Sequence, residues 1–247
     1  MGAVTVITSG KGGVGKSTTA VGIGRALAKK GRRVLLLDCD AGLRSLDRMT
    51  GVEDVLVYDS ADVVAGRCAP IEAIYPCKSF PGLFLMPAPA RGEDMVRESV
   101  MKKLIPLLKQ YYDHVLLDSP AGVGRGFAAA ACGADRAIVV CNPDPVCVRS
   151  TAAVGELLKR LGIEKQRLVI NRFNGELFGK MQVMEDLDKV IDAAGIRLLG
   201  VVPEDASLVV AVMKGGEEPK GCRGMLAMQR LAGRLEGENI PLVFPNK

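Results

Sequence analysis

A glycine-rich loop near the start of the chain constrains the fold more than any other feature. Residues 10–17 read Gly-Lys-Gly-Gly-Val-Gly-Lys-Ser, and they lie between the aliphatic run Val4–Thr8 and the amphipathic segment Ser17–Lys30. Four glycines in eight positions favour a tight turn of the backbone over continued strand or helix. A strand that passes through such a loop into a helix is the opening unit of an α/β fold that binds phosphates at the loop.

The rest of the chain alternates between short aliphatic runs and amphipathic segments, which predicts alternating strands and helices. The runs resemble strands covered on both faces, and they are Val4–Thr8, Arg33–Asp38, Leu83–Met86, His114–Asp118, Ala137–Cys141, Leu168–Ile170 and Leu198–Val202. The predicted helices are Ser17–Lys30, Met95–Tyr111, Val148–Leu161, Val183–Ala193 and Met225–Leu235. Since no internal repeat, linker or low-complexity segment interrupts this pattern, we expect residues 1–247 to form a single α/β P-loop domain with a doubly wound, mostly parallel sheet flanked by helices.

The loop matches the pattern G-x-x-x-x-G-K-S, and each residue type in it suits a nucleoside triphosphate. Its glycines allow successive backbone N–H groups to turn towards phosphate oxygens, and the following helix adds the positive end of its dipole. Lys16 is expected to contact the β and γ phosphates, and the Ser17 hydroxyl is expected to bind Mg²⁺. The sequence therefore predicts ATP and Mg²⁺ as the ligands.

Aspartates stand at the ends of two other predicted strands. Because ligands of a parallel sheet bind at the carboxyl ends of its strands, these residues are candidates for the same site. Asp118 ends one aliphatic run, where an aspartate can hold the Mg²⁺ shell. Asp38 and Asp40 end another, and either carboxylate is a candidate for orienting the attacking water or a Mg²⁺-bound water.

The glycine spacing leaves a second hypothesis open, that of a dinucleotide-binding oxidoreductase. The loop also fits G-x-G-x-x-G, and an acidic residue at the end of the second strand would then bind the ribose. In that class, however, Lys16, Ser17 and Asp118 would have no function. The sequence therefore favours ATP with Mg²⁺ over NAD, and a binding assay distinguishes the two.

Composition limits the other classes of protein. The net charge is +5 and the charges are scattered, so nothing in the sequence requires nucleic acid as a partner. The seven cysteines include no C-x-x-C pair, which indicates reduced and mostly buried thiols in a cytoplasmic protein. No apolar run reaches the length of a membrane-spanning helix, and we expect no secretory signal in the N-terminal strand.

The loop carries an additional lysine at its second position, Lys11, and this variant resembles the deviant Walker A loop of the MinD/ParA ATPases. The resemblance extends to Asp38–Asp47, Val57–Asp59, Asp118–Gly122, Asn142–Pro143, Val148–Arg149, Asn171–Phe173 and Gly200–Asp205. These motifs span roughly residues 1–220. They are most similar to the members of the family that place the bacterial division site.

The resemblance implies an ATPase that hydrolyses ATP to ADP and phosphate and acts as a spatial switch in division-site placement. In the family, the additional lysine reaches the phosphates of a second subunit, so Lys11 is expected to complete the partner's site in an ATP-dependent homodimer. Asp40 matches the aspartate needed for hydrolysis, and Asp118 matches the residue near Mg²⁺. Lys11, Lys16 and Asp40 are thus the predicted catalytic residues, with Ser17 and Asp118 as metal ligands.

The resemblance also implies a set of nucleotide contacts beyond the loop. Asn171 and the segment Pro203–Asp205 match positions around the adenine. The complete predicted set is Gly10, Lys11, Gly12, Gly13, Val14, Gly15, Lys16, Ser17, Thr18, Asn171, Arg172, Pro203, Glu204 and Asp205.

Two departures from the family pattern concern partners. Relatives usually end in a basic amphipathic helix that lies on the membrane, whereas the stretch Glu238–Lys247 contains two prolines. An acid commonly follows the Val148–Arg149 pair, and Ser150 stands there instead. We expect a cytoplasmic protein with a regulatory protein partner, a division inhibitor or an activator of the ATPase. Peripheral association with the inner face of the cell membrane stays open.

Other functions within the same fold are alternatives to division-site placement. A regulator of flagellar number is one, and a ParA-like DNA-partition ATPase is another, although the latter calls for a basic DNA-facing patch that the scattered charges do not provide. A scaffold that binds nucleotide without hydrolysing it is a third. The presence of Lys16, Asp40 and Asp118 argues against such a scaffold, and a turnover assay tests it.

Overall fold

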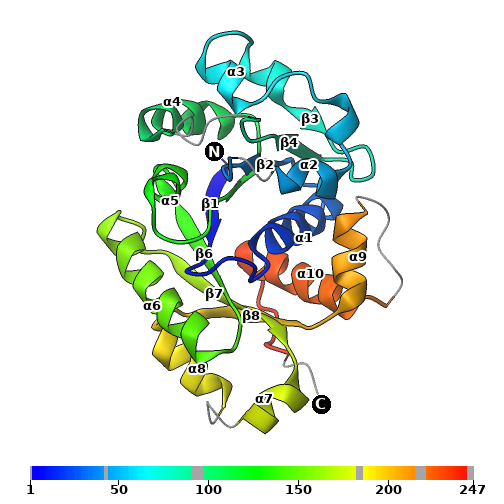
Figure 1. The fold of residues 1–247 in the computed structure, drawn as a ribbon. Helices are drawn as coiled ribbons and strands as arrows, with labels where there is room; N and C mark the ends of the chain where they lie inside the picture. Colours follow the sequence, from blue (N-terminus) through cyan, green and yellow to red (C-terminus); the bar gives the residue numbers. More distant parts are fainter. Residues whose placement is uncertain (1, 42–43, 91–96, 182–185, 215–220, 244–247) are drawn as a thin grey trace.

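The sheet at the centre of the molecule is mostly parallel. In the computed structural model, described for residues 2–41, 44–90, 97–181, 186–214 and 221–243, eight strands form one sheet in the order β3-β4-β2-β5-β1-β6-β7-β8 (Figure 1). Every neighbouring pair is parallel except β3 and β4. The strands are β1 (Ala3–Thr8), β2 (Val34–Asp38), β3 (Tyr75–Pro76), β4 (Leu83–Met86), β5 (His114–Asp118), β6 (Arg136–Cys141), β7 (Gln166–Phe173) and β8 (Leu198–Pro203).

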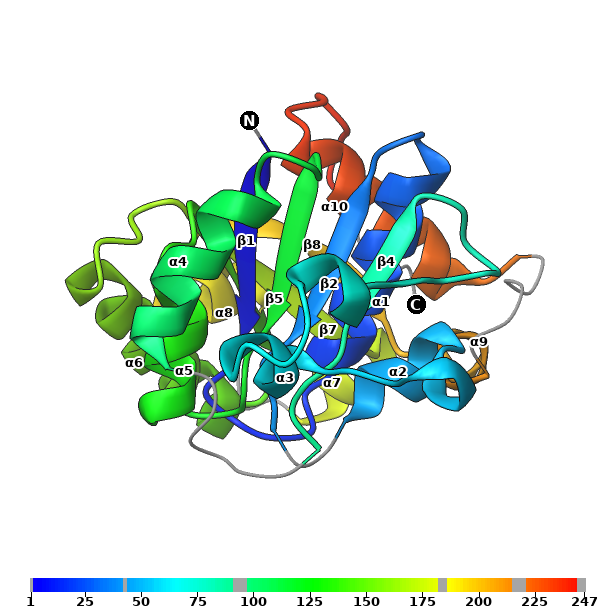
Figure 2. The same cartoon turned by 90° about the horizontal axis from the view of Figure 1, so that it is seen from above.

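Helices cover both faces of this sheet, as Figure 2 shows. On one face α1 (Lys16–Lys29) packs against α10 (Arg223–Leu235), with α2 (Ser45–Thr50) and α9 (Ala206–Met213) beside them. On the other face lie α4 (Glu98–Leu108), α5 (Arg125–Ala131), α6 (Pro145–Arg160) and α8 (Leu187–Ala194). The remaining helical segments are η1 (Glu53–Val55), α3 (Ser60–Val64), η2 (Pro70–Ala73) and α7 (Gly175–Met181). The predicted doubly wound α/β fold is confirmed.

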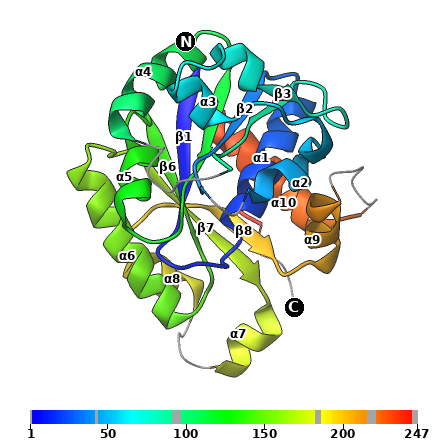
Figure 3. The ribbon, with the colours of Figure 1, turned by 45° about the horizontal axis from the view of Figure 1, so that its top comes forward.

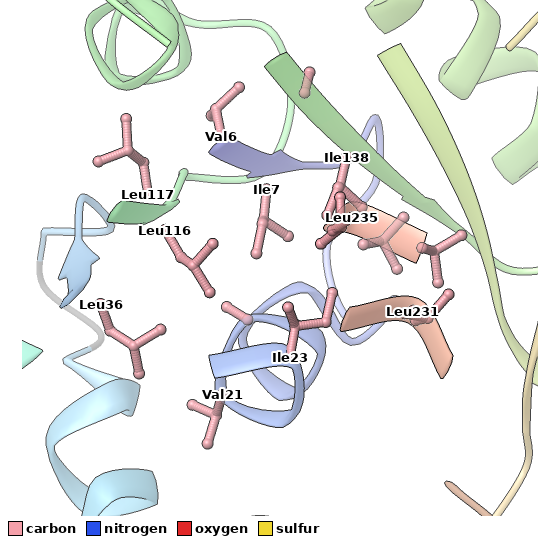
Figure 4. Close-up of a cluster of buried hydrophobic side chains, with 14 of the residues drawn as sticks. Val6, Ile7, Val21, Ile23, Leu36, Leu116, Leu117, Ile138, Leu231 and Leu235 are labelled. Atoms are coloured by element: carbon pink, nitrogen blue, oxygen red, sulfur yellow. The ribbon is translucent and has the colours of Figure 1, made fainter. Parts of the chain in front are cut away.

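The first helix is fixed between the sheet and α10. Figure 4 shows Val21 and Ile23 of α1 among side chains of the sheet and of α10, including Leu36, Leu116 and Leu231, and all five are at most 1% exposed. Each such side chain contributes about 1.5–3 kcal/mol when it is fully buried. Because α1 is held firmly, the loop that leads into it is also fixed at the edge of the sheet.

The order of the strands separates the two hypotheses about the glycine-rich loop. In the dinucleotide-binding fold the first two strands are neighbours. Here β5 lies between β1 and β2, so that Ile7 pairs with Asp118 on one side and Asp38 pairs with Asp118 on the other. This order contradicts the oxidoreductase hypothesis, and it brings Asp118 of β5 to the edge of the sheet where β1 ends. Figure 3 shows the loop, in blue, leaving β1 at that edge and leading into α1.

Several elements differ from their predicted bounds. The helix α6 begins at Pro145 rather than Val148, because Asp144 caps it by accepting a hydrogen bond from the Cys147 amide at 2.9 Å and a proline suits the first turn. The strand β3 was not predicted, since two residues are too short for an alternating pattern. Met95 and Val183, the predicted first residues of two helices, lie outside the described residues, in which α4 and α8 begin at Glu98 and Leu187.

The length and apolar character of each helix show whether it could cross a membrane. Within the described ranges, no helix is both long enough and apolar enough to cross a bilayer.

Candidate nucleotide site

The loop between β1 and α1 has the conformation that its glycines predict. Gly13 and Gly15 have φ angles of 76° and 95°, in the left-handed region that suits glycine. The hydroxyl of Ser9 donates to the carbonyl of Lys11 at 2.8 Å and closes the entry of the loop. At its exit, the hydroxyl of Thr19 donates to the carbonyl of Gly15 at 2.8 Å. The helix thus begins at Lys16, one residue before the predicted start at Ser17.

Two loop glycines also allow close approach by other elements. A Cβ atom at Gly10 would lie 2.6 Å from the backbone of Ser150 in α6, and one at Gly15 would lie 2.3 Å from Nδ2 of Asn171. That same Nδ2 donates to the carbonyl of Val14 at 2.7 Å, and Asn171 is buried. Asn171, which was predicted near the adenine, therefore also fixes the loop from β7.

Lys16, Ser17 and Asp118 meet at the carboxyl edge of the sheet. Lys16 is only 8% exposed, and Asp118 is 1% exposed. Burial raises the pKa of Asp118 to about 6, although the Lys16 ammonium and a hydrogen bond from the Ser17 side chain oppose the rise. These contacts bring the loop and the end of β5 into one site, as the sequence predicts.

The end of β2 adds two more carboxylates to the same edge. Asp38 lies opposite Asp118 in the sheet and is 2% exposed, and its Oδ1 accepts a hydrogen bond from the Asp40 amide at 2.9 Å. Burial, and then repulsion from Asp118, raises the pKa of Asp38 to about 8. Asp40 is half-buried, and its pKa is also raised by burial, with Lys16 opposing. Of the two candidates, Asp40 has the more accessible carboxylate.

The donor atoms at this edge fit a magnesium ion. Oδ1 of Asp118 is buried and has no hydrogen-bond partner among the residues that the structure describes. A bare carboxylate oxygen in such surroundings is costly unless a cation or a donor satisfies it. Mg²⁺ is commonly bound through one or two carboxylates together with phosphates, so the Ser17 hydroxyl and the Asp118 carboxylate are a suitable pair of ligands.

A pocket of about 340 Å³ adjoins the exit of the loop. Its lining includes all six predicted contacts outside the phosphate-binding part of the loop, which are Thr18, Asn171, Arg172, Pro203, Glu204 and Asp205. Leu208 and Val209 of α9 also line it, and neither is among the contacts predicted from the sequence. Their only signal was the apolar character of the segment that follows Asp205. Arg172 has a φ of 53°, an uncommon conformation for a residue with a side chain.

The carboxylate of Asp205 is engaged with the protein itself. It caps α9 through the Ser207 amide at 2.9 Å, and it accepts hydrogen bonds from the Gly224 amide at 2.9 Å and the Cys222 thiol at 3.6 Å. Partial burial opposes ionisation, but these hydrogen bonds and one from the Ser207 hydroxyl lower the pKa of Asp205 to about 2. Asp205 therefore shapes the wall of the pocket by tying α9 to the start of α10.

Lys11 stands apart from this cluster. It is exposed at the entry of the loop, whereas Lys16 is buried at the exit. Gly12 and Gly13 beside it are exposed as well. Part of the predicted segment after β2, residues 42 and 43, lies outside the described residues.

Comparisons with known proteins agree with this geometry. A family model described as the CobQ/CobB/MinD/ParA nucleotide binding domain matches residues 5–217. The septum site-determining protein MinD of Bacillus subtilis is 41% identical over 248 residues, which cover 98% of this chain and 92% of that protein.

Solved structures with the same fold include two division proteins. A chain of the MinC:MinD cell division protein complex of Aquifex aeolicus superposes with a TM-score of 0.87 at 35% identity, covering 99% of this chain and all of that one. The septum site-determining protein MinD of Pyrococcus horikoshii, complexed with Mg-ADP, superposes with a TM-score of 0.85 at 29% identity, and 96% of each chain is covered. Both structural similarities therefore extend over nearly the whole chain.

Proposed function

This chain belongs to the CobQ/CobB/MinD/ParA nucleotide-binding family, and we propose on that basis that it is an ATP-hydrolysing switch in bacterial division-site placement. Its full-length similarity to septum site-determining proteins supports this role over flagellar-number control or DNA partition, the two alternatives within the family. ATP and Mg²⁺ are its cofactors, as the family and the Mg-ADP complex of the Pyrococcus relative indicate.

The observation that carries the proposal is the convergence of one buried lysine and the strand-end carboxylates on the glycine-rich loop. Lys16 lies beside both Asp40 and Asp118 and opposes the rise of their pKa values. Buried carboxylates are costly to ionise, even beside the Lys16 ammonium. That cost would be offset when Mg²⁺ and an anionic phosphate chain bind together at these side chains.

Binding and orientation are assigned to the loop and the pocket. The backbone amides of Gly10–Thr18 surround the phosphates, and Lys16 neutralises the β and γ phosphates. The pocket beside Leu208 and Val209 is assigned to the base, and Asn171 holds the loop through its hydrogen bond to Val14. Ser17 and Asp118 would hold Mg²⁺, which would supply positive charge against the phosphates.

Asp40 is assigned to the attacking water. It is half-buried next to Lys16, whereas Asp38 is enclosed behind it and hydrogen-bonded to its amide. A carboxylate whose pKa is raised by burial accepts a hydrogen bond strongly, which suits it to orienting a water. Asp38 is then a positioning residue that holds Asp40 at the edge of the sheet.

We extend the proposal to assembly. Lys11 is exposed at the loop entry, where it can reach a second subunit, and we infer an ATP-dependent homodimer that each Lys11 completes. The Aquifex relative forms a complex with MinC, so a regulatory protein of that kind is the expected partner here. We place the protein in the cytoplasm, with peripheral membrane association as a further property to be measured.

The test is nucleotide binding and turnover by the purified protein. Lys16→Ala should weaken Mg²⁺-ATP affinity on the order of 100-fold, because hydrogen bonds to a charged group contribute about 1.5–3 kcal/mol each. Titration with a fluorescent ATP analogue measures this loss, and phosphate release with and without EDTA measures the metal requirement. Lys102→Ala, which removes an exposed lysine of α4, is the control. Near-native affinity in Lys16→Ala would refute the assignment of the loop.

A further inference from the structure

Arg25 is a fully buried arginine in the C-terminal half of α1, the helix that starts at the glycine-rich loop. Arginine is almost never fully buried unless other groups of the protein bind its guanidinium. None of the functions assigned above uses this residue. Its contacts therefore indicate what it does.

The Arg25 guanidinium binds the C-terminal turns of two other helices. Nη1 donates to the carbonyl of Ala211 in α9 at 3.1 Å, and Nη2 donates to the carbonyl of Met49 in α2 at 2.7 Å. Both acceptors lie in the last turn of their helix, where carbonyls lack intrahelical partners and the helix dipole is negative. The ring of Phe80 covers a third side, with its centroid 4.1 Å from Cζ.

The two helices that Arg25 joins both start beside the proposed nucleotide site. α2 begins at Ser45, soon after Asp38 and Asp40, and α9 begins directly after Asp205. In addition, α1, α2 and α9 contact one another, and Figure 2 shows α2 and α9 at the same end of α1. The start of α2 is thus close in the chain to the carboxylates assigned to the terminal phosphate and its water. The start of α9 adjoins the wall of the base pocket.

We propose that Arg25 is a positioning residue that couples recognition of the third phosphate to recognition of the base. By holding the ends of α2 and α9 on one rigid, planar group, it keeps these two helices in register with α1 and with the loop that leads into it. The inference rests on one part of the proposed function, which is that the site binds ATP. Arginine suits the role because its fork offers several donors in fixed directions, while lysine offers a single point charge.

The experiment compares affinities for ATP, ADP and inosine triphosphate in the full-length protein. The ATP/ADP ratio reports the third phosphate, and the ATP/inosine triphosphate ratio reports the base. Arg25→Met should lower both ratios together, each by about fivefold, which is the low end of typical coupling between sites. Arg25→Lys, which keeps the charge and can bind one carbonyl, should give an intermediate fall in both, and it serves as the test if Arg25→Met does not fold.

Leu27→Ala provides a matched control on the same helix. Leu27 is also fully buried, so its truncation should lower the melting temperature through a cavity while leaving both ratios at their wild-type values. Unchanged ratios in the arginine variants, or an equal fall in Leu27→Ala, would show that Arg25 only stabilises the fold. If ATP turnover remained intact, either of these results would overturn only the proposed role of Arg25. A wild-type protein that bound no ATP would overturn the proposed function as well.

Discussion

At the scale of single residues, the site depends on carboxylates that are costly to ionise. Asp38 and Asp118 end neighbouring strands, and both are buried almost completely. The glycine-rich loop and the individual aspartates could be predicted from sequence, because each follows a recognisable aliphatic run. Their pairing could not be predicted, since it depends on β5 lying between β1 and β2, and strand order leaves no local signal in the chain.

Asp38 should make the nucleotide-free protein less stable as the pH rises. Its pKa is raised from 3.8 to about 8 in the folded state, so the native protein holds a proton that the unfolded chain has released. The free energy of unfolding therefore falls as the pH increases towards about 8. Melting curves in EDTA from about pH 5 to about pH 9 should show this decline. Asp38→Asn, which cannot ionise, should flatten it, and an unchanged slope would contradict the raised pKa.

Asp40 should be required for hydrolysis but not for binding. Asp40→Ala removes the carboxylate assigned to the water and leaves the loop, Lys16 and Asp118 in place. We expect near-native ATP affinity with turnover reduced by at least about 100-fold, as is typical when a group that acts on the proton of the nucleophile is lost. Steady-state phosphate release measures the effect, with Asp54→Ala as the control at an exposed acid. Turnover at the wild-type rate would exclude Asp40 from catalysis.

At the scale of elements, the base pocket depends on how α9 is attached. Its N-terminal cap, Asp205, also binds the start of α10, so one carboxylate joins two helices that are separated in the chain. The predicted contacts Pro203–Asp205 do line the pocket. Sequence alone could not show that Asp205 binds Gly224, or that Arg25 is buried between α2 and α9, because arginine in a helix is usually exposed and both contacts join distant segments.

Asp205→Ala should therefore weaken both stability and nucleotide binding. Loss of a cap costs about 0.5–2 kcal/mol, and loss of the bond to Gly224 releases the wall of the pocket. Asp186→Ala is a matched control, because Asp186 caps α8 in the same way through the Lys189 amide but does not line the pocket. Thermal melts should show a destabilisation in both variants. ATP affinity should fall only in Asp205→Ala, and an equal fall in the two would contradict the role of the α9 attachment.

At the scale of the whole molecule, the two lysines of the loop face different surroundings. Lys16 is buried beside the aspartates of its own site, whereas Lys11 is exposed at the loop entry. A charge-assisted contact between Lys11 and a phosphate is strong only where water is excluded, and a second subunit placed over the loop would exclude it. ATP would then join two chains through its third phosphate, and ADP would release them, which is a two-state switch biased by the ligand.

The Lys11→Ala variant tests this arrangement. It should bind ATP as a monomer, because Lys16 and the loop amides are retained, and it should lose both dimerisation and hydrolysis, because each site lacks the lysine of the opposite chain. Light scattering in an Asp40→Ala background, where ATP is expected to persist, measures mass with ATP and then with ADP. The background protein should be dimeric with ATP and monomeric with ADP, and Lys102→Ala in that background should behave identically. If Lys11→Ala also dimerised normally with ATP, the lysine would have no role across the interface, and the switch would have to depend on other contacts of the third phosphate.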